Sequence, residues 1–249
     1  LTFKDASGKI LREFTSMEDE IRKAQQNKPD ATQVYLTANE GWNRFVWDMR
    51  LPHSPTIDGG DAQFERMAGP TVVPGNYELS LHVDGNTQSQ PFELVTDPNS
   101  SASAQDLQAQ FDLHKQIYDK YTEATETINT MRALRKQLDA WATRLDKEES
   151  TKPLAESATS LKEHILEIEK ILMLPDLPGG WPGRVNNGIQ VVRKLVALPS
   201  VVGLGEFAPT DQSYAVYEKL SGEIDEQINT FKAVVDSDLK AFNKALAEQ

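Results

Sequence analysis

Residues 75–118 read GNYELSLHVDGNTQSQPFELVTDPNSSASAQDLQAQFDLHKQIY, and this stretch decides the fold class. In its first half apolar residues alternate with polar ones, which is the period of a β-strand with one buried face. In its second half they recur at steps of three and four, the period of an amphipathic helix. Short polar residues after Asp97 separate the halves, and Asn99, Ser100 or Ser101 can serve as the helix N-cap. The sequence predicts an α+β chain of two domains, residues 1–97 and 98–249.

The first domain is predicted to be an Ig-like antiparallel β-sandwich. Gly8, in the turn sequence DASGK, can take the positive φ of a tight hairpin. Expected strands cover residues 1–3, 10–14, 34–37, 45–49, 77–83 and 88–95, with a short helix or insertion over 17–28 and an irregular excursion over 51–74. The strand at 45–49 would place Phe45, Trp47 and Met49 in the core. Six or seven short strands at this spacing are typical of an Ig-like sandwich.

The second domain is predicted to be an elongated antiparallel helical bundle. The expected helices cover about residues 104–147, 153–173, 185–198 and 211–247. The apolar seam of the first helix is expected to contain Leu107, Phe111, His114, Tyr118, Tyr121, Ile128, Met131, Leu138, Trp141 and Leu145. Two long helices that bracket two shorter ones favour a bundle.

Composition excludes several classes of protein. The chain has 249 residues and a formal charge of -12, which would repel a phosphate backbone, so we expect no nucleic-acid partner. No apolar run reaches the length of a membrane span. The absence of cysteine excludes thiol nucleophiles and disulfides but leaves the compartment open. Because the chain opens at Leu1 inside a predicted strand, we expect it to be an excised or processed piece of a longer protein.

Catalytic and metal-binding patterns are weak in this sequence, so we expect no catalytic residue, no metal and no cofactor. The four histidines include no pair at the i, i+4 spacing that directs two imidazoles at one metal. Asp58, Asp61 and Asp84 lie in glycine-containing loops where calcium could bind, but the full ligand series is missing and turn formation explains them. His114 is expected to be a buried, hydrogen-bonded histidine of the helical seam.

Two tryptophans are candidates for ligand binding. Trp42 and Trp181 each neighbour glycine in a turn, where an exposed indole could stack on a sugar ring or anchor a protein partner. The favoured alternative is that Trp42 caps the end of the sandwich and Trp181 closes the end of the bundle, because large aromatic side chains are usually mostly buried.

The segments KDASGKILR (4–12), GWNRFVWD (41–48) and VPGNYEL (73–79) resemble the small Ig-like module of flagellar hook-capping proteins and of many bacterial secreted proteins. Together with AQDLQAQFDL (104–113) and APT (208–210), the chain is similar to the C-terminal region of bacterial sortilin-like, BNR-repeat proteins labelled glycosyl hydrolases. The segments at 17–33 and 51–69 fit this pattern least. The resemblance implies an upstream β-propeller, to which any hydrolase activity would belong, and an extracytoplasmic location. The Asp-box pattern of such repeats does not occur in this chain, so no catalytic residue is carried over.

The leading hypothesis is therefore a non-catalytic structural and interaction module of a larger secreted β-propeller protein. Its partners would be the upstream propeller or other protein subunits, and the bundle could mediate oligomerisation. The first alternative is carbohydrate binding, with Trp42 or Trp181 as the stacking platform. The second alternative is that the chain shapes the cleft of a hydrolase whose active site lies in the propeller.

Overall fold

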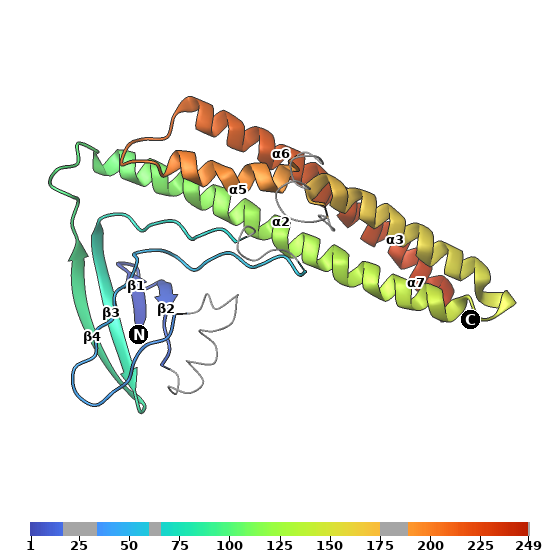
Figure 1. Cartoon of the computed structure of the whole chain (residues 1–249), viewed down its shortest axis with the longest axis horizontal. Coiled ribbons are helices and arrows are strands. Elements are labelled where there is room, and N and C mark those ends of the chain that lie inside the picture. The colour runs from blue at the N-terminus through green and yellow to red at the C-terminus, as the bar shows by residue number, and fades with distance from the viewer. Residues whose placement is uncertain (17–33, 60–65, 175–188, 249) are drawn as a thin grey trace. The chain divides into compact units, whose positions relative to one another are not determined.

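The computed structural model describes residues 1–16, 34–59, 66–174 and 189–248. It combines a small antiparallel sheet with long helices (Figure 1), so the predicted α+β class is confirmed. None of the helices in these ranges is long and apolar enough to cross a membrane. The helix predicted near residues 17–28 lies outside the described residues.

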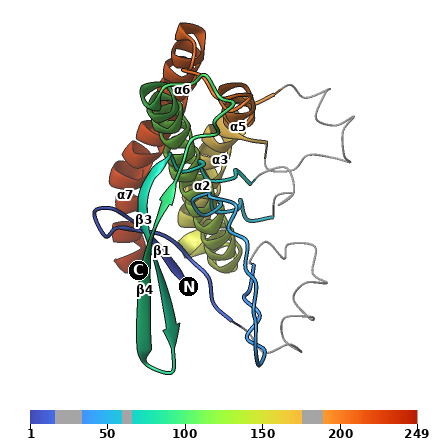
Figure 2. The same ribbon diagram turned by 90° about the vertical axis from the view of Figure 1, so that its left-hand side faces the viewer.

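Four strands form one sheet: β1 (Thr2–Asp5), β2 (Ile10–Glu13), β3 (Gly75–Val83) and β4 (Asn86–Leu94). Their order is β2-β1-β3-β4, and every neighbouring pair is antiparallel (Figure 1). Gly8, at φ +84°, makes the predicted turn between β1 and β2. Asp84 and Gly85, at φ +48° and +79°, form the two-residue turn of the long β3–β4 hairpin (Figure 2).

One face of the sheet carries the apolar core of the β part. Phe3 is buried on this face and stacks on Trp47 with ring centroids 4.3 Å apart. Leu51, Val72 and Tyr77 form the buried centre, against which half-buried residues including Trp47 and Phe92 pack. The segment before Leu51 therefore covers the sheet with aromatic side chains.

The strands predicted at 34–37 and 45–49 are wrong. Both segments lie outside the ladders, with only isolated bridges from Leu36 to Ser16 and from Arg50 to Thr71. The backbone turns at Met49, which has a φ of +57°, and the Trp47 indole donates to the Arg50 carbonyl at 3.2 Å. Met49 consequently reaches solvent and does not join the core. A second sheet, which a sandwich requires, is not formed within the described residues.

The helices are α2 (Ala104–Leu145), α3 (Lys152–Leu172), α5 (Val191–Val202), α6 (Asp211–Val234) and α7 (Lys240–Ala247). A 3₁₀ turn, Glu149–Thr151, precedes α3, and a π-helical segment, Val235–Leu239, joins α6 to α7. α3 packs against α5, α6 and α7, and α5 packs against α6.

The start of α2 differs from the expectation. Ser103, not a residue at 99–101, caps the helix: its hydroxyl accepts from the Asp106 N–H at 3.1 Å, and the Asp106 carboxylate accepts from the Ser103 N–H at 2.9 Å. This reciprocal pairing satisfies two donors at the helix start. α5 also differs, because Ile189 and Gln190 precede it and it continues past Pro199 to the buried Val202.

The seam of α2 is more regular than predicted. Its buried apolar side chains are Leu113, Ile117, Tyr121, Ala124, Ile128, Met131, Leu138 and Leu145. The prediction missed Leu113, Ile117 and Ala124. It also assigned to the seam five residues that are only half-buried: Leu107, Phe111, His114, Tyr118 and Trp141. Residues 117, 124, 131, 138 and 145 recur every seven positions, the repeat of helices packed along their length.

The residues fall into two compact units. The first contains residues 1–54, 66–115 and 203–209, and the second contains residues 55–65, 116–202 and 210–249. The first unit therefore holds the sheet and the start of α2, whereas the second holds most of the helices and a short piece of the excursion after β2. The division into domains at residue 97 stays a prediction.

Candidate interaction site at the end of the sheet

Trp42 stands on a turn that is fixed by its own hydrogen bonds. The Asn43 side chain accepts from the Asn39 N–H at 3.0 Å and donates to the Asn39 and Gly41 carbonyls at 2.8 and 3.3 Å. Gly41 has a φ of +90°, a conformation that few other residues adopt. The exposed fraction of Trp42 is 104%, so the proposal that this indole is buried as a cap is wrong.

The same turn forms one wall of a groove of about 730 Å³. The groove lies where β1 begins and where β2 and β3 end, and residues 36–39 and 43–45 border it. Its polar lining includes Glu13, Asn39, Asn43, Arg44 and His82. Its apolar lining includes Leu36, Phe45, Leu81 and Val83. The groove therefore offers apolar contact together with neutral and charged hydrogen-bonding groups.

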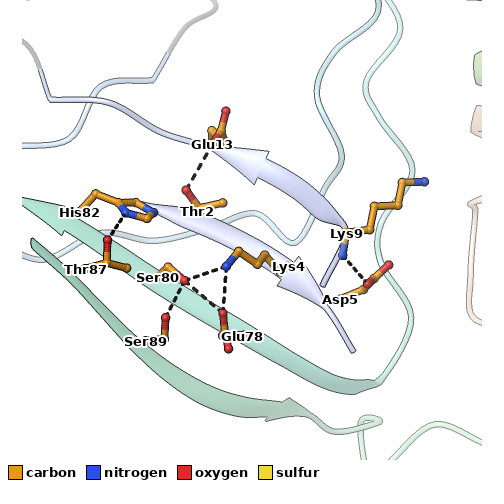
Figure 3. A network of polar contacts seen from close by, with 10 residues as sticks. All are labelled: Thr2, Lys4, Asp5, Lys9, Glu13, Glu78, Ser80, His82, Thr87 and Ser89. Carbon is orange, nitrogen blue, oxygen red and sulfur yellow. Dashed lines mark hydrogen bonds and ion pairs between the residues drawn. The ribbon is translucent and has the colours of Figure 1, made fainter. Parts of the chain in front are cut away.

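The face of the sheet opposite the aromatic core is polar (Figure 3). Lys4 on β1 donates to Glu78 at 3.0 Å and to Ser80 at 3.3 Å, and Ser80 shares a 2.9 Å hydrogen bond with Ser89. The hydrogen bond from Lys4 is the main cause that lowers the pKa of Glu78. Ser80 is fully buried, yet its hydroxyl is satisfied within this network. The polar side chains of this face thus hydrogen-bond to one another.

His82 lies at the end of the polar face, beside the groove. Its Nδ1 is 2.9 Å from the Thr87 hydroxyl on β4 (Figure 3). The side chain is exposed, as the alternation of the strand predicted. His82 and Thr87 therefore mark the tip of the hairpin with two small polar groups.

The other predicted site residues are not brought together. Trp181 and Asp61 lie outside the described residues. Asp58 and Asp84 belong to different units, and Asp84 serves the β3–β4 turn. Within the described ranges no group of three His, Asp or Glu side chains could hold a metal ion. Calcium binding that involves Asp61 stays a prediction.

His114 lies in α2 and is only partly buried, and its hydrogen bonding also differs from the expectation. Its Nε2 is buried and has no hydrogen-bond partner among the residues described. Burial lowers the pKa of His114 to about 4, and the charge of Arg50 acts in the same direction. The imidazole is therefore neutral at pH 7.

Sequence reasoning missed a buried ionic cluster in the helical unit. Glu169 on α3 is fully buried, its Oε1 is 2.6 Å from Nε of Arg132, and its Oε2 accepts from Arg135. Arg132 also donates to the backbone carbonyl of Asp58. The signal was present in the sequence: Arg135 lies seven residues after the seam residue Ile128, and Glu169 lies four residues after Ile165. Arg135 and Glu169 thus occupy seam positions of their helices.

The chain was compared with models of protein families, with curated proteins and with solved structures. No family model, no curated protein and no solved structure matches it.

Proposed function

We propose that this chain is a non-catalytic structural and interaction module of a larger, secreted β-propeller protein of the bacterial sortilin-like, BNR-repeat type. We further propose that its β part is Ig-like, with the observed four-stranded sheet as one sheet of a sandwich, and that its helical part is an elongated antiparallel bundle. One contact supports the Ig-like assignment: the Tyr77 hydroxyl, near the start of β3, donates to the Val73 carbonyl. A tyrosine that bonds upstream backbone in this way recurs in Ig-like sandwiches.

The observation that carries the proposal is the fully exposed Trp42 on its fixed turn. An exposed indole costs solvation free energy, and tryptophan is among the residues that contribute most to protein interfaces. Because the Asn39–Asn43 hydrogen bonds already hold the turn, little conformational entropy would be lost on binding. Trp42 is therefore proposed as the anchor of the partner contact.

The helices are the weaker candidate for the partner surface. In the described helices the exposed large apolar side chains are Ile171, Val201 and Val216, one each on α3, α5 and α6. Single exposed apolar residues are ordinary on protein surfaces. The contact is therefore proposed for the β part, and oligomerisation through the bundle remains the subordinate proposal.

The test has two steps. Intact mass and peptide mapping of the natural protein would establish whether a propeller is joined to this chain. The propeller, produced separately, should then bind this chain in a calorimetric titration, and Trp42→Ala should weaken binding by roughly thirtyfold or more. Val46→Ala is the matched control, since Val46 is 71% exposed four residues away. Equal affinity of the wild type and Trp42→Ala would reject Trp42 as the anchor.

Carbohydrate binding is the second candidate, and the groove beside the Trp42 turn favours it. Glu13, Asn43 and Arg44 line this groove and could bind sugar hydroxyls while the indole stacks on a ring. Affinity electrophoresis in gels that contain soluble glucans, xylans or mannans would test this function. Retardation that is lost in Trp42→Ala and kept in Val46→Ala would support it, whereas unretarded migration in every gel would reject it.

A further inference from the structure

We propose that a second groove, between the end of α2 and the start of α3, binds a basic α-helix of a partner protein. This inference goes beyond the contact proposed at Trp42 and does not depend on it. The groove has a volume of about 540 Å³, and residues 139–163 alone supply its walls. They form one uninterrupted stretch of the described chain, in which α3 runs back along the end of α2 (Figure 1). We call this feature the helical groove.

The helical groove is part of a packed pair of helices. Beneath it the seam residues Leu138 and Leu145 on α2 and Leu161 on α3 are buried. Lys162 of α3 donates to the Asp139 carboxylate of α2 at 2.6 Å, which links the two helices at one end of the groove. Because the walls are already packed, little conformational entropy would be lost when a partner binds.

The floor of the helical groove consists of small side chains, which are Ala142 and Thr143 on α2 and Ala155 and Thr159 on α3. The Thr143 hydroxyl donates to the Asp139 carbonyl at 2.9 Å, and the Thr159 hydroxyl donates to the Ala155 carbonyl at 3.0 Å. Both hydroxyls are therefore satisfied by their own helices. Because the distance between packed helices depends on the side chains at the contact, this floor lets a partner helix come close.

Carboxylates surround the floor. Asp146 on α2 and Glu156 and Glu163 on α3 line the helical groove, and none of the three forms an ion pair with another described residue. Asp139 and Lys162 compensate each other, so three negative charges remain in the lining. A positively charged partner complements these charges. A second copy of this chain is disfavoured, because each copy has a formal charge of -12.

The spacing of the lining residues fits an α-helix. From Asp139 to Asp146 the groove follows seven residues of α2, which is about 10 Å or two helical turns. A helix along the groove would direct a stripe of every third or fourth residue at the floor. Glu156 and Glu163 are also seven residues apart, so two basic residues at that spacing can pair with them while a third faces Asp146. The occupant is thus a helix with a stripe of alanine, glycine or serine between lysines or arginines.

A labelled helical peptide tests the proposal. The probe is acetyl-AKQAAQKAKQAAKQ-amide with a fluorophore, titrated with this chain and followed by fluorescence anisotropy. Saturable binding that weakens about tenfold from low to high ionic strength is the expected result, because salt screens exposed charges. The peptide acetyl-KAQAKAQKAQAKAQ-amide has the same composition but lysines in the stripe, and it should bind about tenfold more weakly. Absence of saturable binding at low ionic strength, or equal affinity for the two peptides, would overturn the proposal.

A substitution in the floor identifies the site. Thr143→Tyr places a ring in the helical groove and should lower the peptide affinity about tenfold or more. Ala140→Tyr is the matched control, because Ala140 is exposed on the same helix but does not line the groove. Circular dichroism should show both variants folded. Equal affinities of the two variants for the peptide would overturn the proposal.

Substitutions in the rim test the charge complementarity. The double variant Glu156→Gln with Glu163→Gln should lower the peptide affinity roughly fivefold, since each exposed ion pair contributes modestly. The double variant Glu218→Gln with Glu226→Gln removes the same charge from exposed positions of α6 and should have less than about a twofold effect. Equal losses in the two variants would show a response to net charge only and would overturn the proposed site.

Two further measurements separate this inference from the proposed function. Trp42→Ala should bind the peptide as the wild type does, so a peptide failure with intact, Trp42-dependent propeller binding would reject only the helical groove. Sedimentation velocity of the chain alone should show no self-association through this surface. Dimers that Thr143→Tyr abolishes would instead assign the helical groove to a second copy and overturn the inference.

Discussion

Among individual residues, Glu169 is a buried charge whose stability depends on two arginine partners. Its carboxylate is fully buried and faces Arg132 and Arg135, whose side chains keep 16% and 22% of their surface exposed. Removing the charge leaves two guanidinium groups without their counter-ion in a partly dry interface. Glu169→Gln should therefore lower the free energy of unfolding by about 2–4 kcal/mol in urea titrations.

The matched control for this change is Glu167→Gln on the same helix. Glu167 pairs with Lys170 at 2.7 Å, but both side chains are largely exposed. Exposed pairs contribute little, so the loss should be below about 0.5 kcal/mol. Equal losses for the two variants would show that the buried cluster contributes no more to the free energy of unfolding than an exposed ion pair does.

The lowered pKa of His114 predicts that the chain loses stability in acid. Its pKa is about 4 in the folded chain, below the ordinary value of 6.5, because burial disfavours the charged imidazole. As pH falls from 6.5 towards 4 the unfolded chain binds a proton that the folded chain does not, so the free energy of unfolding decreases. The decrease between pH 7.5 and pH 5 should be up to about 2 kcal/mol.

His114→Gln should remove this acid-dependent part, while the exposed His82→Gln should leave it unchanged. Urea titrations of the wild type, His114→Gln and His82→Gln at pH 7.5 and pH 5 measure how much stability each chain loses in acid. The pKa of His53 is also lowered by burial and should contribute a remaining slope in all three. Identical slopes in the wild type and His114→Gln would contradict the assignment.

At the level of elements, the π-helical segment between α6 and α7 has a clear packing reason. Buried seam residues of α6 run from Ile224 and Ile228 through Phe231 to Val234, and the next buried residue is Phe242. Eight residues of regular α-helix would rotate Phe242 about 80° from Val234. A π segment accommodates one extra residue, so the spacing acts as the seven of a heptad and Phe242 returns to the seam.

Deleting Ser237, an exposed residue of the π segment, should therefore be tolerated. The segment can become regular helix with Phe242 still in the seam, and the free energy of unfolding should change by less than about 1 kcal/mol. Deleting the exposed Thr230 instead moves Phe231 and Val234 out of register and should cost about 3 kcal/mol or more. Urea unfolding followed by circular dichroism compares them, and similar losses would refute this explanation.

At the level of the whole molecule, residues far apart in the sequence make the helical unit. Residues 55–59 belong to it, with Ile57 buried and Asn129 of α2 bonded on both sides of that residue. The Asn129 amide donates to the Thr56 carbonyl at 2.9 Å and accepts from the Asp58 N–H at 2.8 Å. The excursion after β2 is therefore not merely a surface loop.

Asn129→Ala should release this segment. Two hydrogen bonds are lost, so the free energy of unfolding should fall by about 1–2 kcal/mol and amide exchange at Asp58 should accelerate. Thr127→Ala is the control, since its hydroxyl donates to the Glu123 carbonyl of its own helix at 2.8 Å. Unchanged exchange at Asp58 in the Asn129 variant would contradict the role of this side chain.

The sequence by itself determined the elements whose signals are local. Gly8 and the Asp84-Gly85-Asn86 turn specify two hairpins through backbone conformation, and the steps of three and four residues specify the long helices. Trp42 was recognised as a candidate because it neighbours a glycine in a turn. Its exposure did not follow from the sequence, because a tryptophan in a turn can be buried as well as exposed.

Only the tertiary structure decided which apolar patterns became strands and which surfaces remained open. The alternation at Phe45, Trp47 and Met49 looks like a strand, but aromatic packing on Phe3 stabilises this segment without a hydrogen-bonded neighbour. The groove at the end of the sheet is lined by residues of three separate segments, 1–2 and 13–16, 36–45, and 81–83. The pairing of Glu169 with two arginines likewise depends on helix register. These features involve contacts between distant residues, which local periodicity and turn chemistry do not encode.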